Sequence, residues 1–220
     1  MSTRPQIADT REAVTGKIIE ARAVAVLRMT DSRKLLGVVD ALREGGLTAI
    51  EVTMTVPDAL RLVEEVSRAF GEAVILGVGS VLDAQTAQRA IDAGARYVVS
   101  PVFKPEVLDV AHRNGCPAMP GAFTPTEVLH AQEEGADIVK VFPADVVGMA
   151  FFRAVLAPMP HLRMMPTGGV TLDNAGDWIR AGAVAVGVGS ALLDKKAIAE
   201  GNLNILTENA RRLMSNARAA

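Results

Sequence analysis

Short apolar segments alternate with longer amphipathic stretches along the whole chain. The apolar segments are of strand length, and most are rich in valine or isoleucine, which predicts buried β-strands. They cover residues 23–28, 49–54, 73–79, 96–100, 116–120, 137–142, 163–167 and 183–189. The stretches between them carry apolar residues at helical spacing, so the pattern predicts strands and helices in strict alternation.

Several of the helices can be placed by their apolar face or by their first residue. Apolar residues at helical spacing mark 32–45, and further helices are predicted at 83–93, 173–181 and 203–217. Asp83 is a predicted N-cap, and Asp173 and about Ala191 are predicted helix starts. Residues 10–22 read as an additional helix before the first strand.

A glycine recurs at the end of a predicted helix, just before a strand. Gly46, Gly94, Gly135 and Gly182 follow one another at intervals of 41 to 48 residues, which suits two strand–helix units per repeat. Gly71 and Gly115 hold the same place before two intervening strands. A left-handed glycine at the helix end is the expected connection to a strand. We therefore predict a single (β/α)8 TIM barrel over residues 1–220 with an extra N-terminal helix, and a doubly wound open sheet as the alternative.

Composition narrows the function classes. The net charge is −2 and aromatic residues make up 4%, with no basic run, which argues against a nucleic-acid partner. The polar N-terminus is not expected to be a signal peptide, and the apolar runs are shorter than the roughly 20 residues of a membrane span. Cys116 is the single cysteine, so we expect no disulfide, no zinc site and a reducing cytoplasm. No cofactor or metal is predicted, and the three histidines are interpreted as surface or packing residues.

Three charged side chains stand at the ends of otherwise apolar strands. Strand alternation predicts that Arg28, Glu51 and Lys140 point into the barrel, at the face where barrels of this kind hold their chemistry. Unpaired buried charges are costly, so these residues are either paired or functional. The structural interpretation is a Glu51–Lys140 salt bridge. The catalytic interpretation is a lysine that forms a Schiff base with a ketone, with Glu51 as its general acid and base.

Glycine-rich turns follow three of the strands. PTGGV at 166–170 and GVGS at 187–190 come after the last two strands, where barrels often bind phosphate, and Thr167 and Ser190 add hydroxyl donors. Plain turn glycines are the alternative interpretation. A second GVGS at 77–80 could bind a carboxylate through Ser80.

Seven segments together make the sequence resemble the 2-keto-3-deoxy-6-phosphogluconate (KDPG) and 2-keto-4-hydroxyglutarate aldolases. These are IEVTMTVPDA, GVGSVLDAQ, VSP, MPGAFTPTE, VKVFPAD, PTGGV and VGVGSALL, between about Ala23 and Leu193. The resemblance implies Lys140 as the Schiff-base lysine and Glu51 as the catalytic glutamate. It also implies a set of substrate-binding positions, which with the neighbouring strand-end residues comprises Thr53, Gly79, Ser80, Pro101, Phe142, Thr167, Gly168, Gly169 and Ser190.

The family resemblance has one departure and several consequences. Some members carry an arginine four residues after the glutamate, where this chain has Thr55, and Arg28 could replace it or could instead pair with Glu51 or a loop carboxylate. The resemblance implies a homotrimer and cleavage of KDPG to pyruvate and glyceraldehyde 3-phosphate, with 2-keto-4-hydroxyglutarate as a further candidate substrate. A phosphosugar isomerase and a non-catalytic phospho-ligand binding barrel are the alternative functions.

Overall fold

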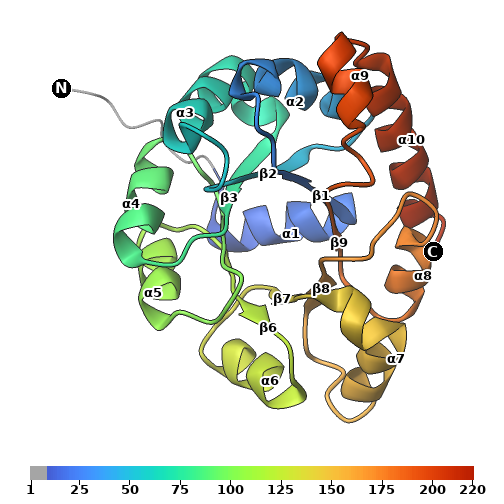
Figure 1. Cartoon of the computed structure of the whole chain (residues 1–220). Helices are drawn as coiled ribbons and strands as arrows, with labels where there is room; N and C mark the ends of the chain where they lie inside the picture. The colour runs from blue at the N-terminus through green and yellow to red at the C-terminus, as the bar shows by residue number, and fades with distance from the viewer. Residues whose placement is uncertain (1–8) are drawn as a thin grey trace.

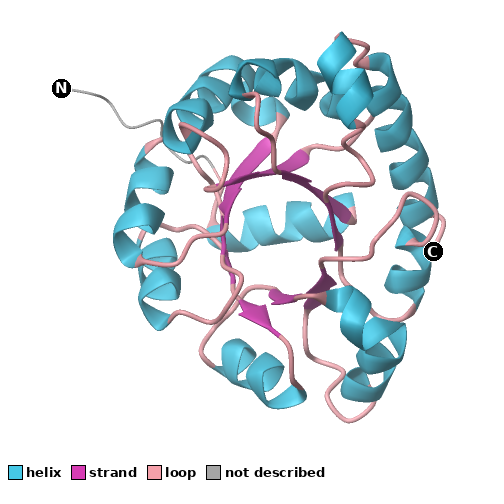
Figure 2. Cartoon of the chain, viewed as in Figure 1, coloured by secondary structure: helices cyan, strands magenta, loops and turns pink. Residues whose placement is uncertain are grey.

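The computed structural model describes residues 9–220, so the first eight residues of the predicted domain and of the polar N-terminus lie outside the described residues. Short strands form an inner ring that helices surround (Figures 1 and 2). Within residues 9–220 the strands are β1 (Ala23–Leu27), β2 (Ala49–Thr53), β3 (Ile75–Gly79), β4 (Val98–Val99), β5 (Ala118–Met119), β6 (Gly121–Ala122), β7 (Val139–Val141), β8 (Met164–Pro166) and β9 (Val186–Val188).

Neighbouring strands are parallel and close into a barrel. The hydrogen-bonded order is β5-β4-β3-β2-β1-β9 in one sheet and β6-β7-β8 in the other. A parallel bridge between Thr167 and Gly187 joins β8 to β9. The other junction is Pro120, which stands between β5 and β6 and has no backbone N–H to donate. The predicted barrel is confirmed and the open-sheet alternative is wrong.

The helices lie outside the strands, with one exception. They are α1 (Arg11–Ala21), α2 (Leu35–Glu44), α3 (Ala59–Phe70), α4 (Ala84–Asp92), α5 (Pro105–Arg113), α6 (Pro125–Glu133), α7 (Ala144–Leu156), α8 (Ala175–Arg180), α9 (Lys195–Glu200) and α10 (Asn204–Arg218), with short 3-10 turns η1 (Ser32–Lys34) and η2 (Gly71–Ala73). The exception is α1, which crosses one opening of the barrel (Figure 2). The extra N-terminal helix is thus confirmed.

Alternation along the strands separates two apolar clusters. Val139, Val141 and the outward residues of the other strands pack under the helices. Ile138 and Met165 lie in the inner cluster, together with Val14 and Ile18 of α1. The helix α1 therefore closes the end of the barrel where the strands begin, and the loops that follow the strands remain at the opposite end.

The helix ends follow the predicted glycine chemistry. Gly46, Gly94, Gly135 and Gly182 have φ angles between 87° and 111°, a region that costs other residues about 1 to 2 kcal/mol. Their place between helix and strand explains the recurring interval in the sequence. Asp83 caps α4 as predicted, since its side chain accepts a hydrogen bond from the backbone N–H of Thr86 at 2.7 Å.

Two predicted helix starts are wrong. The helix α8 begins at Ala175 rather than Asp173, whose carboxylate instead pairs with Arg212 at 2.6 Å. The segment after β9 does not begin a helix at Ala191; it forms a turn in which the N–H of Leu192 donates to the carbonyl of Gly189 at 3.0 Å. The next helix, α9, starts at Lys195. Neither glycine-rich segment therefore leads directly into a helix.

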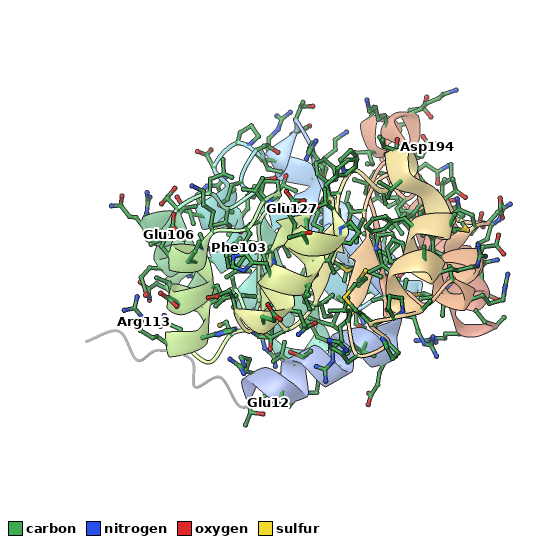
Figure 3. All side chains as sticks on the ribbon, turned by 90° about the horizontal axis from the view of Figure 1, so that it is seen from below. Glu12, Phe103, Glu106, Arg113, Glu127 and Asp194 are labelled. Atoms are coloured by element: carbon green, nitrogen blue, oxygen red, sulfur yellow. The ribbon has the colours of Figure 1, made fainter. Side chains whose placement is uncertain are left out.

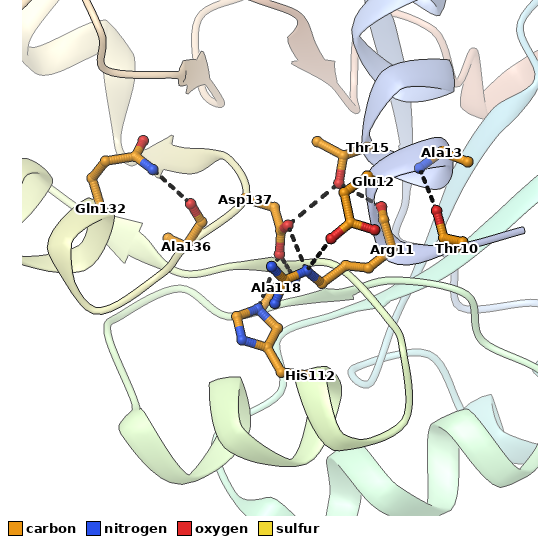
Figure 4. Close-up of polar contacts among 10 residues, drawn as sticks. All are labelled: Thr10, Arg11, Glu12, Ala13, Thr15, His112, Ala118, Gln132, Ala136 and Asp137. Atoms are coloured by element: carbon orange, nitrogen blue, oxygen red, sulfur yellow. Dashed lines mark hydrogen bonds and ion pairs between the residues drawn. The ribbon is translucent and has the colours of Figure 1, made fainter.

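The two ends of the barrel are built differently (Figure 3). Glu12 of α1 marks the closed end, and Asp194, the N-cap of α9, lies at the opposite end. At the closed end, α1 is tied to the barrel by Asp137, which contacts Arg11, Thr15 and His112 (Figure 4). In the part of the chain that the structure covers, no helix is long and apolar enough to cross a membrane.

Candidate active site

Lys140 and Glu51 meet inside the barrel. Lys140 is on β7 and Glu51 is on β2; three strands (β1, β9 and β8) separate them in one direction around the ring and four short ones (β3 to β6) in the other. Both side chains are long enough to cross the interior, and Lys140 Nζ lies 3.9 Å from Glu51 Oε1. Glu51 is 0% exposed and Lys140 is 6% exposed. The sequence prediction that these two residues converge inside the barrel is confirmed.

The surroundings of Glu51 offer it little compensation for burial. Neither carboxylate oxygen accepts a hydrogen bond from any residue in 9–220. A carboxylate without water or hydrogen-bond donors is destabilised by several kcal/mol. Among the described residues, Lys140 is its one ion-pair partner. A pair kept only for stability would be expected to satisfy its remaining lone pairs, so this arrangement is typical of a reactive site.

The segment GVGS at 77–80 makes room for Glu51. A Cβ atom on Gly79 would overlap Oε1 of Glu51, so only glycine allows the carboxylate to lie over β3. The next residue, Ser80, has a φ of 61°, which is uncommon for a residue with a side chain. Such backbone outliers cluster at ligand sites. Gly79 therefore makes space for Glu51, and Ser80 directly follows β3.

Phe142 and Arg28 lie at the rim. The Phe142 ring centroid is 5.5 Å from Lys140 Nζ, and the ring is 38% exposed, so it flanks the lysine from the open end. Arg28 directly follows β1 and is exposed, whereas the sequence analysis places it inside with Val24 and Val26. The prediction that Arg28 points into the buried interior is therefore wrong. The alternative pairing of Arg28 with Glu51 is also wrong, since the carboxylate pairs with Lys140.

The loop after β8 is shaped by its two glycines. Gly168 and Gly169 have φ angles of 100° and 71°, and a Cβ on Gly169 would lie 2.6 Å from the Cβ of Asp145 at the start of α7. The side-chain amide of Asn174 donates to the Gly169 carbonyl at 3.0 Å and holds the turn. The conformation therefore requires glycine at both positions.

Hydroxyl groups flank this loop. Thr167 is buried, and its Oγ1 has no hydrogen-bond partner within residues 9–220, which leaves it able to donate to a ligand. Ser190 is exposed in the turn after β9, the strand bridged to Thr167 through Gly187. The two predicted phosphate loops are thus neighbours in the barrel, as the sequence analysis expects.

Two further predicted residues occupy the same end. Thr53 ends β2 and is buried; its hydroxyl donates to the carbonyl of Leu27 at 3.1 Å and contacts the Thr55 hydroxyl at 2.8 Å. Pro101 follows β4, and its carbonyl lies so close to Gly121 that a Cβ there would overlap it. Both residues therefore shape the rim through backbone contacts.

The sequence analysis missed Tyr97 and the polar cluster around Asp137. Tyr97 precedes β4, is completely buried and belongs to the inner cluster. Its alternation with Val99, which also faces inward, is the signal that could have placed it. Among the described residues, no group of histidine, cysteine and acidic side chains could hold a metal ion.

Known proteins with similar sequences identify the family. The family described as "Aldolase: KDPG and KHG aldolase" matches residues 14–208. The chain belongs to the KDPG and KHG aldolase family. It is thus a class I aldolase, a carbon–carbon lyase, as the resemblance implies.

Three individual relatives agree with the family. The chain is 38% identical over 175 residues to a probable 2-dehydro-3-deoxy-6-phosphogalactonate aldolase of Rhizobium meliloti, covering 79% of this chain and 82% of the relative. It is 35% identical over 184 residues to the 2-dehydro-3-deoxy-phosphogluconate aldolase of Pseudomonas aeruginosa, covering 83% of each. It resembles the crystal structure of the KDPG aldolase from Legionella pneumophila, with pyruvate captured as a covalent carbinolamine, at a TM-score of 0.83 and 26% identity over 90% of this chain and 96% of that one.

Proposed function

We propose that this aldolase cleaves KDPG to pyruvate and glyceraldehyde 3-phosphate through a Schiff base on Lys140. The observation that carries the proposal is the approach of Lys140 Nζ to Glu51 Oε1, 3.9 Å apart in an otherwise apolar interior. A lysine amine that reaches a substrate ketone in such an interior can add to it and form a Schiff base. The carbinolamine captured in the Legionella pneumophila crystal structure supports the same chemistry here.

The proposed reaction uses the two residues in turn. The Lys140 amine adds to the C2 ketone, water leaves, and the resulting iminium accepts the electron pair of the C3–C4 bond. Glu51 takes the proton of the C4 hydroxyl, which releases the aldehyde and leaves an enamine. A proton returned by Glu51 to C3 and hydrolysis of the iminium then release pyruvate and restore the free lysine. Every bond broken is thus balanced without a cofactor or a metal.

The remaining predicted residues are assigned to binding. We place the distal phosphate at Gly168, Gly169 and Ser190, with Thr167 beneath it, and the pyruvate carboxylate at Ser80. Ser190→Ala should raise KM about tenfold for phosphorylated substrates and leave oxaloacetate decarboxylation unchanged, because one charge-assisted hydrogen bond is lost. Equal losses with both substrates would place Ser190 outside the phosphate site.

Borohydride reduction in the presence of pyruvate tests the Schiff base directly. A pyruvate-dependent mass increase on the peptide containing Lys140 is expected in the wild-type protein. The control is Lys104→Met, which lacks a half-exposed lysine near the rim. Its peptide containing Lys140 should be labelled to the same extent as in the wild-type protein. An adduct on another lysine, or none, would overturn the assignment and would favour the isomerase or binding-only alternatives.

The galactonate epimer of the substrate is a second candidate. The 38% identical relative from Rhizobium meliloti is named for that compound, and both epimers give the same two products. Comparison of kcat/KM for the two epimers and for 2-keto-4-hydroxyglutarate decides between them. The homotrimer implied by the family and the cytoplasmic location favoured by the single cysteine stay predictions, which sedimentation and cell fractionation would test.

A further inference from the structure

Tyr97 presents an unusual polar group inside the barrel. It is the single tyrosine of the chain and is 0% exposed. Its ring packs in the inner cluster with Val24, Ile75 and Met119. Its hydroxyl oxygen has no hydrogen-bond partner within residues 9–220, although buried tyrosine hydroxyls usually find one.

Two glycines of β3 show where this hydroxyl lies. A Cβ atom on Gly77 would overlap the Tyr97 ring at Cζ, Cε1 and Cε2, so the hydroxyl-bearing end of the ring covers Gly77. A Cβ atom on Gly79 would overlap Oε1 of Glu51, so the carboxylate covers the next position on the same face of the strand. The end of the Tyr97 ring therefore lies over β3 two residues before the position that the Glu51 carboxylate covers.

The two groups cover neighbouring positions of β3, at a spacing of the order that one bridging water spans. Strand positions two residues apart are about 6.6 Å apart. Two O–H···O hydrogen bonds in series through one water reach up to about 5.5 Å. Buried waters typically bind polar groups that lack other partners, which describes both Tyr97 Oη and the Glu51 carboxylate.

The chemistry of the two groups is complementary. Burial, and then the charge of Glu51, raise the pKa of Tyr97 well above its usual value, so the phenol keeps its proton throughout the working range. An ionised carboxylate can only accept hydrogen bonds, whereas a phenol can donate one. A donor directed at Glu51 from below stabilises its charged form and leaves its open side to Lys140 and the substrate.

We propose that Tyr97 is a positioning residue for Glu51, and that its hydroxyl donates through one buried water to the carboxylate and holds it ionised over β3. The proposal rests on the proposed function, in which Glu51 is the general base. Loss of the hydroxyl makes the carboxylate easier to protonate, and so moves the acidic limb of catalysis. Loss of the Tyr97 hydroxyl should leave binding of the substrate phosphate at Gly168, Gly169 and Ser190 unchanged.

Tyr97→Phe tests the proposal because it removes one oxygen atom and keeps the ring. The acidic limb of the kcat/KM profile should move about one pH unit upward, which is a loss of about tenfold at pH values below the limb. The matched control is Thr207→Val, which removes another buried hydroxyl, on α10, that bonds the Ala41 carbonyl. The control should change the melting temperature alone.

A second measurement needs no turnover. Because Tyr97 is the single tyrosine, labelling with [13Cζ]tyrosine gives one resonance, which should move in Glu51→Gln and stay in place in Thr207→Val. An unchanged pH profile in Tyr97→Phe, or a resonance unaffected by Glu51→Gln, overturns the proposal. If the wild-type protein does not trap pyruvate on Lys140 while the resonance responds, the proposed function fails and the link between Tyr97 and Glu51 stands.

Discussion

Among residues 9–220 two carboxylates are buried, one near each end of the barrel, and their surroundings are opposite. Asp137, at the end closed by α1, accepts a hydrogen bond from the backbone N–H of Ala118 at 2.9 Å and lies 3.1 Å from His112 Nε2 and 3.3 Å from Arg11 Nε. Glu51, deeper and nearer the open end, has Lys140 at 3.9 Å and no hydrogen bond from the described residues. The same functional group is thus fully compensated in one place and barely compensated in the other.

This difference separates a structural carboxylate from a reactive one. Each lone pair of Asp137 that is used by a fixed donor stabilises one geometry and leaves nothing to offer a substrate. The carboxylate oxygens of Glu51 remain free to accept hydrogen bonds from a substrate. The unfavourable free energy of burying this carboxylate is offset by the packing of the rest of the fold. Substitutions at the two ends should therefore divide cleanly between stability and catalysis.

Removal of the lysine should have the largest effect. Lys140→Met keeps a linear side chain in the apolar interior and removes the amine, so cleavage should fall by several orders of magnitude. Lys104→Met is the matched control and should retain turnover. If Lys140→Met still cleaves the substrate, another residue is the nucleophile. The interpretation of Lys140 and Glu51 as a structural salt bridge would then be favoured.

Neutralisation of Glu51 should have the next largest effect. Glu51→Gln preserves the shape beside Gly79 and removes the base, so kcat should fall by about 10² to 10⁴-fold. Borohydride trapping of pyruvate should survive in part, because it needs the lysine first. Turnover equal to that of the wild-type enzyme would show that another group carries the proton.

The corresponding change at the closed end should affect stability instead. Asp137→Asn keeps an oxygen for Ala118 and His112 but directs amide protons toward Arg11 and Thr15. Unfolding should become easier by about 2 kcal/mol, with kcat and KM unchanged. For a protein of this size that lowers the melting temperature by about 4 to 8 °C. Chemical denaturation followed by activity assays measures both.

Asp177→Asn provides the control for that substitution. Asp177 is exposed and pairs with Arg180 on the surface of α8, where ion pairs contribute about 0 to 1 kcal/mol. A stability loss confined to Asp137→Asn supports the contrast between buried and surface carboxylates. An activity loss in Asp137→Asn would instead link the closed end to the active site.

Local sequence rules predict most of the barrel and the central pair of residues. Alternation separates Lys140 and Ile138 from Val139, and helix-ending glycines mark the strand starts, because both depend on neighbours in the sequence. The misplaced start of α8 has a different cause. Asp173 is drawn to Arg212 on α10, a contact between distant segments that no local pattern reports.

The same limit explains what was missed at the site. Asp137 is compensated by α1 and α5, and Tyr97 lies over a glycine of β3, so both depend on how distant elements pack. Arg28 shows the reverse error. Alternation assigns it to the inner face, but β1 ends at Leu27, and a side chain beyond the last strand residue reaches solvent at the rim.

Exposure of Arg28 at the rim predicts the smallest of these effects. Arg28→Met should raise KM about tenfold with kcat nearly unchanged, because a guanidinium that binds an anionic end of the substrate acts equally in ground and transition states. The melting temperature should not change, since the side chain is exposed and Glu51 keeps its partner Lys140. Arg33→Met is the matched control, because Arg33 is also exposed, in η1 after β1, and pairs with Asp31 at 3.0 Å. A normal KM in Arg28→Met would show that Arg28 does not replace the arginine that some family members carry where this chain has Thr55. The anionic ends of the substrate would then be bound by backbone and hydroxyl donors alone.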